Sequence, residues 1–319
     1  MRVGWLWWTL AGCGAPVASD QVRAGGASTP LVATPVPAAP VASAPASGAP
    51  PVALAGRRII AMGDLHADLP MAIANLRLAG LLDAAGAWSG GDTILVQTGD
   101  ITDRGPDSKE LIELMQRLSR EAPAAGGLVL PLLGNHEAMN LLGDWRYVSD
   151  GDYADFGGPE GRRAAFAPTG PLGSWLRGLD AVAQLGDTVF VHGGVGPDFA
   201  ARGAAGLSAD VRAALQGRPD DPVLGPEGPL WLRSLVLDDE ATACPALQRS
   251  LERMAAKRMI VGHTTQRSGR ILSRCGGALL AIDTGISSHY GAHGAAVELR
   301  DGDAWALYPE GRVDLEDPR

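Results

Sequence analysis

Short apolar runs alternate with amphipathic segments from Arg57 onward, and this alternation predicts strands and helices in turn. The runs interpreted as buried strands are RRIIAMGD (57–64), TILVQTGD (93–100), GLVLPLLGNHE (127–137), TVFVHGG (188–194), RMIVGHT (258–264) and ALLAIDTG (278–285). In the segments 69–86 and 108–122, apolar residues recur every three or four positions, which predicts helices. Strands separated by helices indicate an α/β fold with a parallel sheet covered on both faces.

The rest of this region predicts one hairpin and two insertions. The stretch AAVELRDGDAWALYP (295–309) is typical of a closing hairpin with glycine in its turn. The stretches 144–187 and 196–256 are rich in Gly and Pro, so we expect helical or loop insertions there.

The N-terminus follows a different pattern. MRVGWLWWTLAGC (1–13) has one early positive charge, a short apolar core and small residues before Cys13, which is typical of a cleaved secretory signal. Its ending, LAGC, resembles the lipobox of bacterial lipoproteins, whose cysteine is acylated and becomes the new N-terminus. The resemblance implies a signal peptide over residues 1–12 and lipid chains on Cys13. The alternative is an ordinary signal peptide with an incidental cysteine.

Residues 13–56 consist largely of Ala, Pro, Val, Ser, Gly and Thr, and their prolines oppose both helix and central strand. We therefore expect a disordered tether here and one folded domain over 57–319. The expected location is the cell envelope, on the periplasmic side, with membrane attachment only through the N-terminal lipid. Because Gly14 lacks the carboxylate that would suggest inner-membrane retention, the outer membrane is the expected one.

Charge and composition narrow the functional classes. The net charge of -9 and the pI near 5.1 argue against a general nucleic-acid surface, which needs clustered Lys and Arg. No apolar run reaches the roughly 18 residues that span a bilayer. We expect a monomer.

Chelating side chains follow five of the apolar runs. Because the carboxyl ends of strands in such sheets meet at one edge, these side chains should lie close together. Any single one is compatible with a structural role, but five in the same position indicate a site. The residues are Asp64 and His66, Asp100, Asn135 and His136, His192, and His263.

This set of oxygen and nitrogen donors contains no thiolate, so it suits Mn, Fe or Zn rather than a calcium cage. It is too large for one ion, whereas a central carboxylate such as Asp100 can be shared by two. Two ions about 3.5–4 Å apart can acidify a bridging water and stabilise both the attacking and the leaving oxygen of an in-line displacement at phosphate.

Five motifs occur in order, and they resemble those of the calcineurin-like metallophosphoesterases: GDLH (63–66), GDITDRG (99–105), GNHE (134–137), VHGG (191–194) and GH (262–263). The second and third are similar to the phosphoprotein phosphatase branch. GNHEAMNLLGDWRYV, with GPLWLR and VGHTTQ downstream, is similar to the bacterial and plant Shewanella-like phosphatases. The resemblance implies central β-sheets flanked by helices, with a dinuclear metal site at the carboxyl ends of strands.

The resemblance also implies the metal ligands. Those of the first ion would be Asp64, His66 and Asp100. Those of the second would be Asp100, Asn135, His192 and His263. Both ions would be divalent or trivalent, with Mn²⁺ expected in vitro and Fe or Zn as alternatives.

In the same resemblance, His136 is the general acid that protonates the leaving oxygen, and Asp103 orients its ring. Arg104 would bind the phosphate through its planar fork, with Asn135 beside it. Arg233, in PLWLR, is the candidate for a second phosphate-binding arginine, and the alternative for it is a surface salt bridge.

Six further residues lie outside the expected ligand and substrate-binding sets. Ala67 stands where the family usually has glycine, and it is strained only if that position needs a positive φ. Glu137 lies outside the ligand set, as a charge that complements the start of a helix. Cys244 and Cys275 form a disulfide, or else two unpaired buried cysteines. His289 and His293 match no motif and are expected to be loop residues.

The implied activity is that of a metal-dependent phosphomonoesterase. Its expected substrates are phosphotyrosine, phosphoserine or phosphothreonine in proteins, or small phosphoesters, attacked in line by a hydroxide that bridges the metals. One alternative is a symmetrical dinucleoside polyphosphate hydrolase. The other, from a different class, is a non-catalytic envelope lipoprotein that keeps the fold for binding.

Overall fold

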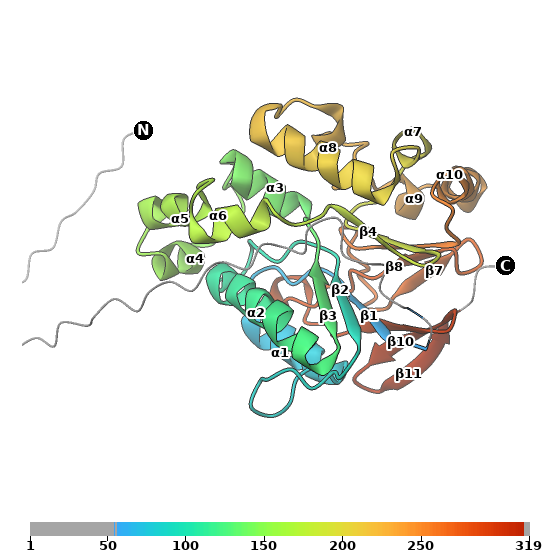
Figure 1. Ribbon diagram of the computed structural model, residues 1–319, viewed down its shortest axis with the longest axis horizontal. Coiled ribbons are helices and arrows are strands. Elements are labelled where there is room, and N and C mark those ends of the chain that lie inside the picture. Colours follow the sequence, from blue (N-terminus) through green and yellow to red (C-terminus); the bar gives the residue numbers. More distant parts are fainter. Residues whose placement is uncertain (1–53, 55, 316–319) are drawn as a thin grey trace, which may run out of the picture. The chain divides into compact units, whose positions relative to one another are not determined.

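Two mixed β-sheets organise the part of the chain that this computed structural model describes, Leu54 and residues 56–315 (Figure 1). The predicted signal peptide, Cys13 and nearly all of the predicted tether lie outside these residues.

The first sheet has six strands in the order β11-β10-β9-β1-β2-β3. Their bounds are β1 Ile59–Met62, β2 Ile94–Gln97, β3 Leu128–Pro131, β9 Ala296–Arg300, β10 Asp303–Tyr308 and β11 Gly311–Leu315. β1, β2 and β3 are parallel, whereas β9, β10 and β11 add an antiparallel half beside β1. The expected closing hairpin is therefore β9–β10, extended by one further strand.

The second sheet has five strands in the order β4-β5-β6-β8-β7. Their bounds are β4 Val182–Leu185, β5 Thr188–Val191, β6 Arg258–Val261, β7 Leu272–Arg274 and β8 Leu279–Ala281. The three central strands are parallel, and an antiparallel strand closes each edge.

The two sheets flanked by helices confirm the architecture that the family resemblance implies, and they differ from the parallel sheet that the apolar pattern alone predicts. Side chains from both sheets, among them Ala61, Val96, Phe190 and Ile260, form one apolar cluster, so the sheets pack face to face. The alternate residues of the same strands enter a second cluster on the helix side. A strand buried on both faces has the same apolar pattern whether a helix or another sheet covers it, and the sequence therefore could not separate the two cases.

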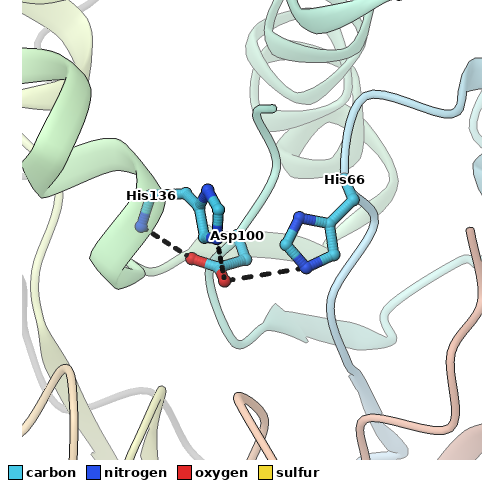
Figure 2. Close-up of side chains that lie close together, drawn as sticks. All are labelled: His66, Asp100 and His136. Atoms are coloured by element: carbon cyan, nitrogen blue, oxygen red, sulfur yellow. Dashed lines mark hydrogen bonds and ion pairs between the residues drawn. The ribbon is translucent and has the colours of Figure 1, made fainter. Parts of the chain in front are cut away.

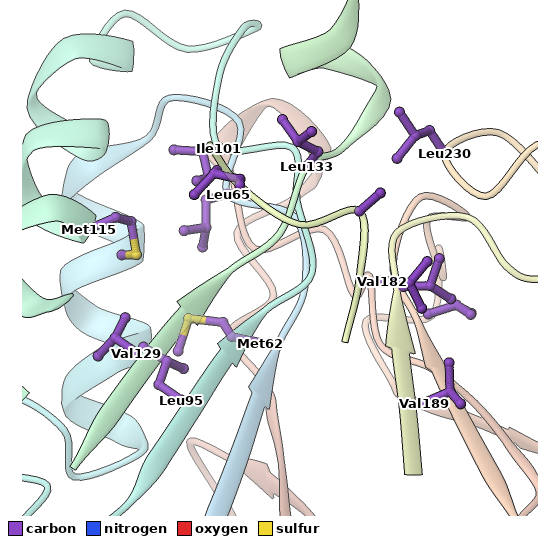
Figure 3. Packing of buried hydrophobic residues seen from close by; sticks show 14 of the residues in the cluster. Met62, Leu65, Leu95, Ile101, Met115, Val129, Leu133, Val182, Val189 and Leu230 are labelled. Carbon is purple, nitrogen blue, oxygen red and sulfur yellow. The ribbon is translucent and has the colours of Figure 1, made fainter. Parts of the chain in front are cut away.

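Helices α1 (Leu69–Leu78) and α2 (Ser108–Glu121) cover the outer face of the first sheet (Figure 1). Met115 of α2 belongs to the same cluster as Met62 and Val129 of the sheet (Figure 3). The side chain of Asp68 accepts a hydrogen bond from the Met71 amide and so caps α1. This helix ends well before the predicted boundary, because the chain turns at Gly80 with φ +68°.

The two insertions are mainly helical, as expected. The first contains α4 (Asp150–Asp155), α5 (Pro159–Phe166) and α6 (Pro171–Leu176), and β4 lies at its end. The second contains α7 (Pro197–Ala200), α8 (Gly203–Gly217), α9 (Ser234–Leu237) and α10 (Glu240–Arg253). The remaining helical elements are α3 (Asn135–Leu142) and the 3-10 turns Ala122–Ala125, Pro222–Leu224 and Ser288–Tyr290.

Cys244 and Cys275 form a disulfide with their Cα atoms 5.4 Å apart, which attaches α10 to the segment after β7. Across the described residues, none of the helices combines the length and the apolar character needed to cross a membrane.

Candidate metal centre

The ends of five strands bring the predicted side chains to one place. In the first sheet, Asp64 and His66 follow β1, Asp100 follows β2, and Asn135 and His136 follow β3 at the start of α3. In the second sheet, His192 follows β5 and His263 follows β6. Each of these residues is at least 95% buried. The predicted convergence is present, although it involves two sheets rather than one.

Asp100 lies at the centre of the cluster. Its Oδ2 atom is 3.8 Å from Nε2 of His66, 3.8 Å from Nε2 of His136 and 3.3 Å from Nε2 of His192. Figure 2 shows this carboxylate between the rings of His66 and His136. Two groups of potential ligand atoms share Asp100: one with His66 and His136, the other with His192 and His263. This sharing is the arrangement that a dinuclear site requires.

Asp64 and Asn135 complete the polar interior of the site. Both carboxylate oxygens of Asp64 accept from the backbone amide of His263 at 3.1 Å, and Oδ2 lies 3.8 Å from Nε2 of His66. Oδ1 of Asn135 is 2.8 Å from Nε2 of His192. Asp64 thus joins the loop after β1 to the loop after β6.

The protonation tendencies fit a pair of metal ions. Burial lowers the pKa of His66 to about 3, and burial together with His192 and Arg233 lowers that of His263 to about 2. Both rings are therefore neutral, which is the form that binds metals. Burial, Asp283 and Asp100 all raise the pKa of Asp64, because its carboxylate lies away from water and beside other carboxylates. Carboxylate oxygens and neutral imidazoles together suit divalent cations.

His136 and Asp103 form the predicted pair. Nδ1 of His136 lies 2.7 Å from Oδ2 of Asp103, so Nε2 is the nitrogen left facing Asp100 and the cavity. Burial alone would lower the pKa of His136, but the carboxylates of Asp100 and Asp103 raise it. The ring is accordingly held in the orientation that a proton donor needs.

Unusual backbone conformations concentrate at this site. Ten non-glycine residues of the described chain have a positive φ, and six of them lie here. They are His66, Ala67, Asp100, Asp103, Arg104 and His263, with φ between 47° and 72°. Such residues persist only where the surrounding structure holds them, and they cluster at functional sites. Ala67, at φ +51°, therefore occupies a position that does need a positive φ, and it is strained there.

Glu137 has a larger role than the helix-start charge that the sequence suggests. It is completely buried and accepts hydrogen bonds of 2.8–2.9 Å from the amides of Asp100, Ile101, Thr102 and Gly134, and a further one of 2.9 Å from the Thr102 hydroxyl. It thereby joins the loop after β2 to the loop after β3. A Cβ at Gly134 would lie 2.1 Å from Oδ1 of Asp100, so only glycine permits this approach.

A cavity of about 190 Å³ opens beside the cluster, and both predicted arginines border it. The Arg104 guanidinium stacks 3.9 Å from the Tyr147 ring centre, and its buried Nε has no hydrogen-bond partner, which leaves a donor for a ligand. Arg233 donates from Nη1 to the carbonyl of His263 at 2.7 Å. The ion pairs found among the described residues do not include Arg233, so the salt-bridge alternative has no support.

Three aromatic residues line this cavity, and two of them, Tyr290 and Trp231, were not expected there. Tyr290 lies 4.9 Å from the His66 ring, Tyr147 lies 5.1 Å from that of His136, and Trp231 lies 5.7 Å from that of His263. They belong to none of the metal-binding motifs, and a lone aromatic residue in a loop carries no signal that separates packing from binding. His289 and His293 do not line the cavity.

Comparisons with known proteins agree with this geometry. The profile of the family described as calcineurin-like phosphoesterase matches residues 57–266. An uncharacterised protein of Schizosaccharomyces pombe is 36% identical over 77% of this chain and 78% of its own. Shewanella-like protein phosphatase 2 of Arabidopsis thaliana is 32% identical over 72% of this chain and 71% of its own. The crystal structure of a cold-active protein-tyrosine phosphatase from a psychrophilic Shewanella species superimposes with a TM-score of 0.73, at 28% identity, over 84% of this chain and 82% of that one.

Proposed function

Because the chain belongs to the calcineurin-like phosphoesterase family, whose members are metal-dependent hydrolases, we propose that it is a protein phosphatase that hydrolyses phosphomonoesters through two bound ions. The observation that supports this function is that potential metal ligands, a candidate proton donor and two arginines lie around one cavity. Two groups of potential ligand atoms share Asp100, His136 of the first group is paired with Asp103, and two arginines line the same cavity.

The ions would be held by the residues that converge at the strand ends: Asp64, His66 and Asp100 for one, and Asp100, Asn135, His192 and His263 for the other. When bound, two such ions lower the pKa of water and stabilise negative charge on a phosphoryl group. We propose Mn²⁺ as the ion that supports activity in vitro, with Fe and Zn as alternatives for the same donors.

The remaining residues bind the phosphate and supply a proton. Arg104 and Arg233, which are far apart in the sequence, both line the cavity, and their guanidinium groups would bind phosphate oxygens. Since Nδ1 of His136 is engaged with Asp103, Nε2 is the atom that would donate a proton to the leaving oxygen as its bond to phosphorus breaks.

Phosphotyrosine is the first substrate class to test. Tyr147 and Tyr290 line the cavity, where a leaving group with an aromatic ring would contact their rings. The Shewanella neighbour carries the name of a protein-tyrosine phosphatase, and the Arabidopsis relative that of a protein phosphatase. Phosphoserine and phosphothreonine remain within the proposed substrate range.

The test is a comparison of kcat/KM for the purified chain, loaded with Mn²⁺, on phosphotyrosine, phosphoserine and phosphothreonine peptides and on diadenosine tetraphosphate. We expect a peptide to be the best substrate. A higher kcat/KM for the dinucleotide would replace this function with that of a dinucleoside polyphosphate hydrolase. A chain that binds no ion by elemental analysis and hydrolyses none of the substrates would be a binding protein.

We also propose that the protein is lipid-anchored in the cell envelope through Cys13. The support is the LAGC sequence, which lies outside the described residues.

A further inference from the structure

Arg162 is a completely buried cation to which the roles above assign no function. It lies on α5, in the first insertion, outside all five motifs. The centre of its guanidinium is 4.3 Å from the ring centre of Phe166, 5.7 Å from that of Phe156 and 6.0 Å from that of Tyr153. Because a buried charge is costly unless it is paired, its polar partners indicate what it does.

Three acceptors surround the guanidinium. Nε donates to Oδ2 of Asp152 at 2.8 Å, and Nη1 donates to Oδ1 of Asn140 at 2.5 Å. Nη2 lies 3.5 Å from Oδ1 of Asp103, the carboxylate that also contacts His136. Arg162 is therefore one residue removed from the proposed proton donor.

Asn140 strengthens this connection. Since a guanidinium only donates, it requires Asn140 to present its amide oxygen, and this fixes the orientation of the amide. Nδ2 of Asn140 then donates to Oδ1 of Asp103 at 2.9 Å and to the carbonyl of His136 at 2.8 Å. With Oδ1 of Asp103 engaged from two sides, Oδ2 is the oxygen left for Nδ1 of His136.

The contacts close into a ring that fixes Asp103. Oδ1 of Asp152 accepts from the amide of Ser108 at 3.0 Å, and the hydroxyl of Ser108 accepts from the amide of Asp103 at 3.3 Å. Asp103 has φ +69°, which a residue with a side chain adopts only when its surroundings impose it. Arg162 and Asp152 thus hold both the backbone and the carboxylate of this strained residue.

We propose that Arg162 is a positioning residue for protonation of the leaving group. It holds Oδ1 of Asp103 and orients Asn140, so that Oδ2 of Asp103 keeps the ring of His136 in the donating orientation. This inference rests on the proposed function, because it presumes that His136 protonates the leaving oxygen. It assigns a part in the reaction to the insertion that carries α5.

The dependence of kcat on the acidity of the leaving group distinguishes this positioning role from a purely structural one. A misplaced acid slows the release of a poor leaving group, whereas a good one departs without protonation. For Arg162→Lys, which keeps the charge but loses the fork, we expect kcat on phenyl phosphate to fall about 10-fold to 100-fold. KM should stay within about twofold, and kcat on 2,4-dinitrophenyl phosphate should change less than about threefold.

Two further variants complete the experiment on the full chain loaded with Mn²⁺. Arg163→Lys changes the exposed neighbour on the same helix and should match the wild type on both substrates. Asn140→Leu removes the amide bridge while Arg162 and Asp152 stay paired, so it should repeat the Arg162→Lys pattern. Should Arg162→Lys prove unfolded by circular dichroism, Asn140→Leu decides the question.

The inference is overturned if the folded variants lower kcat equally on both substrates, or lower it on neither. His136→Asn distinguishes a failure of the positioning role of Arg162 from a failure of the proposed role of His136 as the proton donor. If that variant slows only phenyl phosphate and the Arg162 and Asn140 variants do not, the positioning role fails alone. If it shows no dependence on the leaving group, the proposed role of His136 fails first.

Discussion

Ala67 shows how a single methyl group bears on the loop that carries a metal ligand. The residue follows His66 directly, its side chain is completely buried, and its φ is +51°. Its amide donates to the carbonyl of Ile101 at 2.7 Å, and its carbonyl accepts from the amide of Asp107 at 2.9 Å. The loop after β1 is therefore fastened to the loop after β2 through a strained residue.

Ala67→Gly should raise the free energy of unfolding by up to about 1 kcal/mol. The left-handed conformation costs a residue with a Cβ about 1–2 kcal/mol, which exceeds the roughly 0.5–1 kcal/mol entropic cost of glycine. Urea denaturation measures the change. Ala72→Gly, in the interior of α1, is the matched control and should be destabilising. A loss of stability in Ala67→Gly would show that burial of the methyl group outweighs the strain.

His136→Asn and Asp100→Asn should separate proton donation from metal binding. The first should lower kcat about 10²-fold to 10⁴-fold while the metal content stays near normal, because the leaving oxygen loses its acid but no proposed ligand is removed. The second should lose both activity and metal, since Asp100 belongs to both ligand groups. Elemental analysis beside steady-state kinetics measures both effects. If the metal content of His136→Asn falls as well, His136 is a ligand.

The sequence predicted the polar side chains that converge at the strand ends. It did not predict the hydrogen bonds of Glu137 and Arg162, which position the loops and side chains around them. Asp64, His66 and His192 stand in short motifs at strand ends, where residue type and position together are informative. Glu137 lies within a motif, yet its five hydrogen bonds go to backbone and hydroxyl groups that become neighbours only in the folded chain. Arg162 lies in an insertion without any motif, so no local pattern connects it to Asp103.

At the level of elements, the apolar runs predicted where strands lie but not which sheet they join. β1 and β5 are both four-residue runs buried at every position, and neither contains information about its partner. Pairing depends on contacts between residues far apart in sequence, such as Thr188 with Arg258. The sequence predicted helical or loop insertions without giving bounds for their helices. Those bounds depend on caps and turns that form only when the chain packs.

The disulfide is a testable element-level feature. Replacing Cys244 and Cys275 together by Ser should lower the free energy of unfolding by roughly 3–4 kcal/mol, because the bond closes a loop of about 30 residues and so restricts the unfolded chain. Chemical denaturation of the double variant and of the oxidised wild type measures the difference. Equal stabilities would show that the bond does not stabilise the folded protein by restricting the unfolded chain.

On the scale of the whole chain, we expect the folded part to determine activity and the predicted N-terminal signal to determine location. Cys13→Ala should move the protein from the membrane fraction to the soluble fraction without changing kcat/KM, because residue 13 belongs to the predicted lipid attachment and to none of the proposed ligands. Fractionation with an activity assay measures both. A variant that stays with the membrane would show that attachment does not depend on Cys13.

The proposed ligands of the metal centre are divided between the two sheets. Four follow strands of the first sheet, namely Asp64, His66, Asp100 and Asn135, whereas His192 and His263 follow strands of the second. A partly unfolded chain in which the sheets have separated cannot keep a complete ligand set. Ions that bind only the docked state add RT ln(1 + [ion]/Kd) to the free energy of unfolding. The supply of metal ions would therefore affect the lifetime of the folded protein as well as its catalytic rate. Chelation would make separation of the sheets more frequent, and their facing surfaces would then be accessible to proteases.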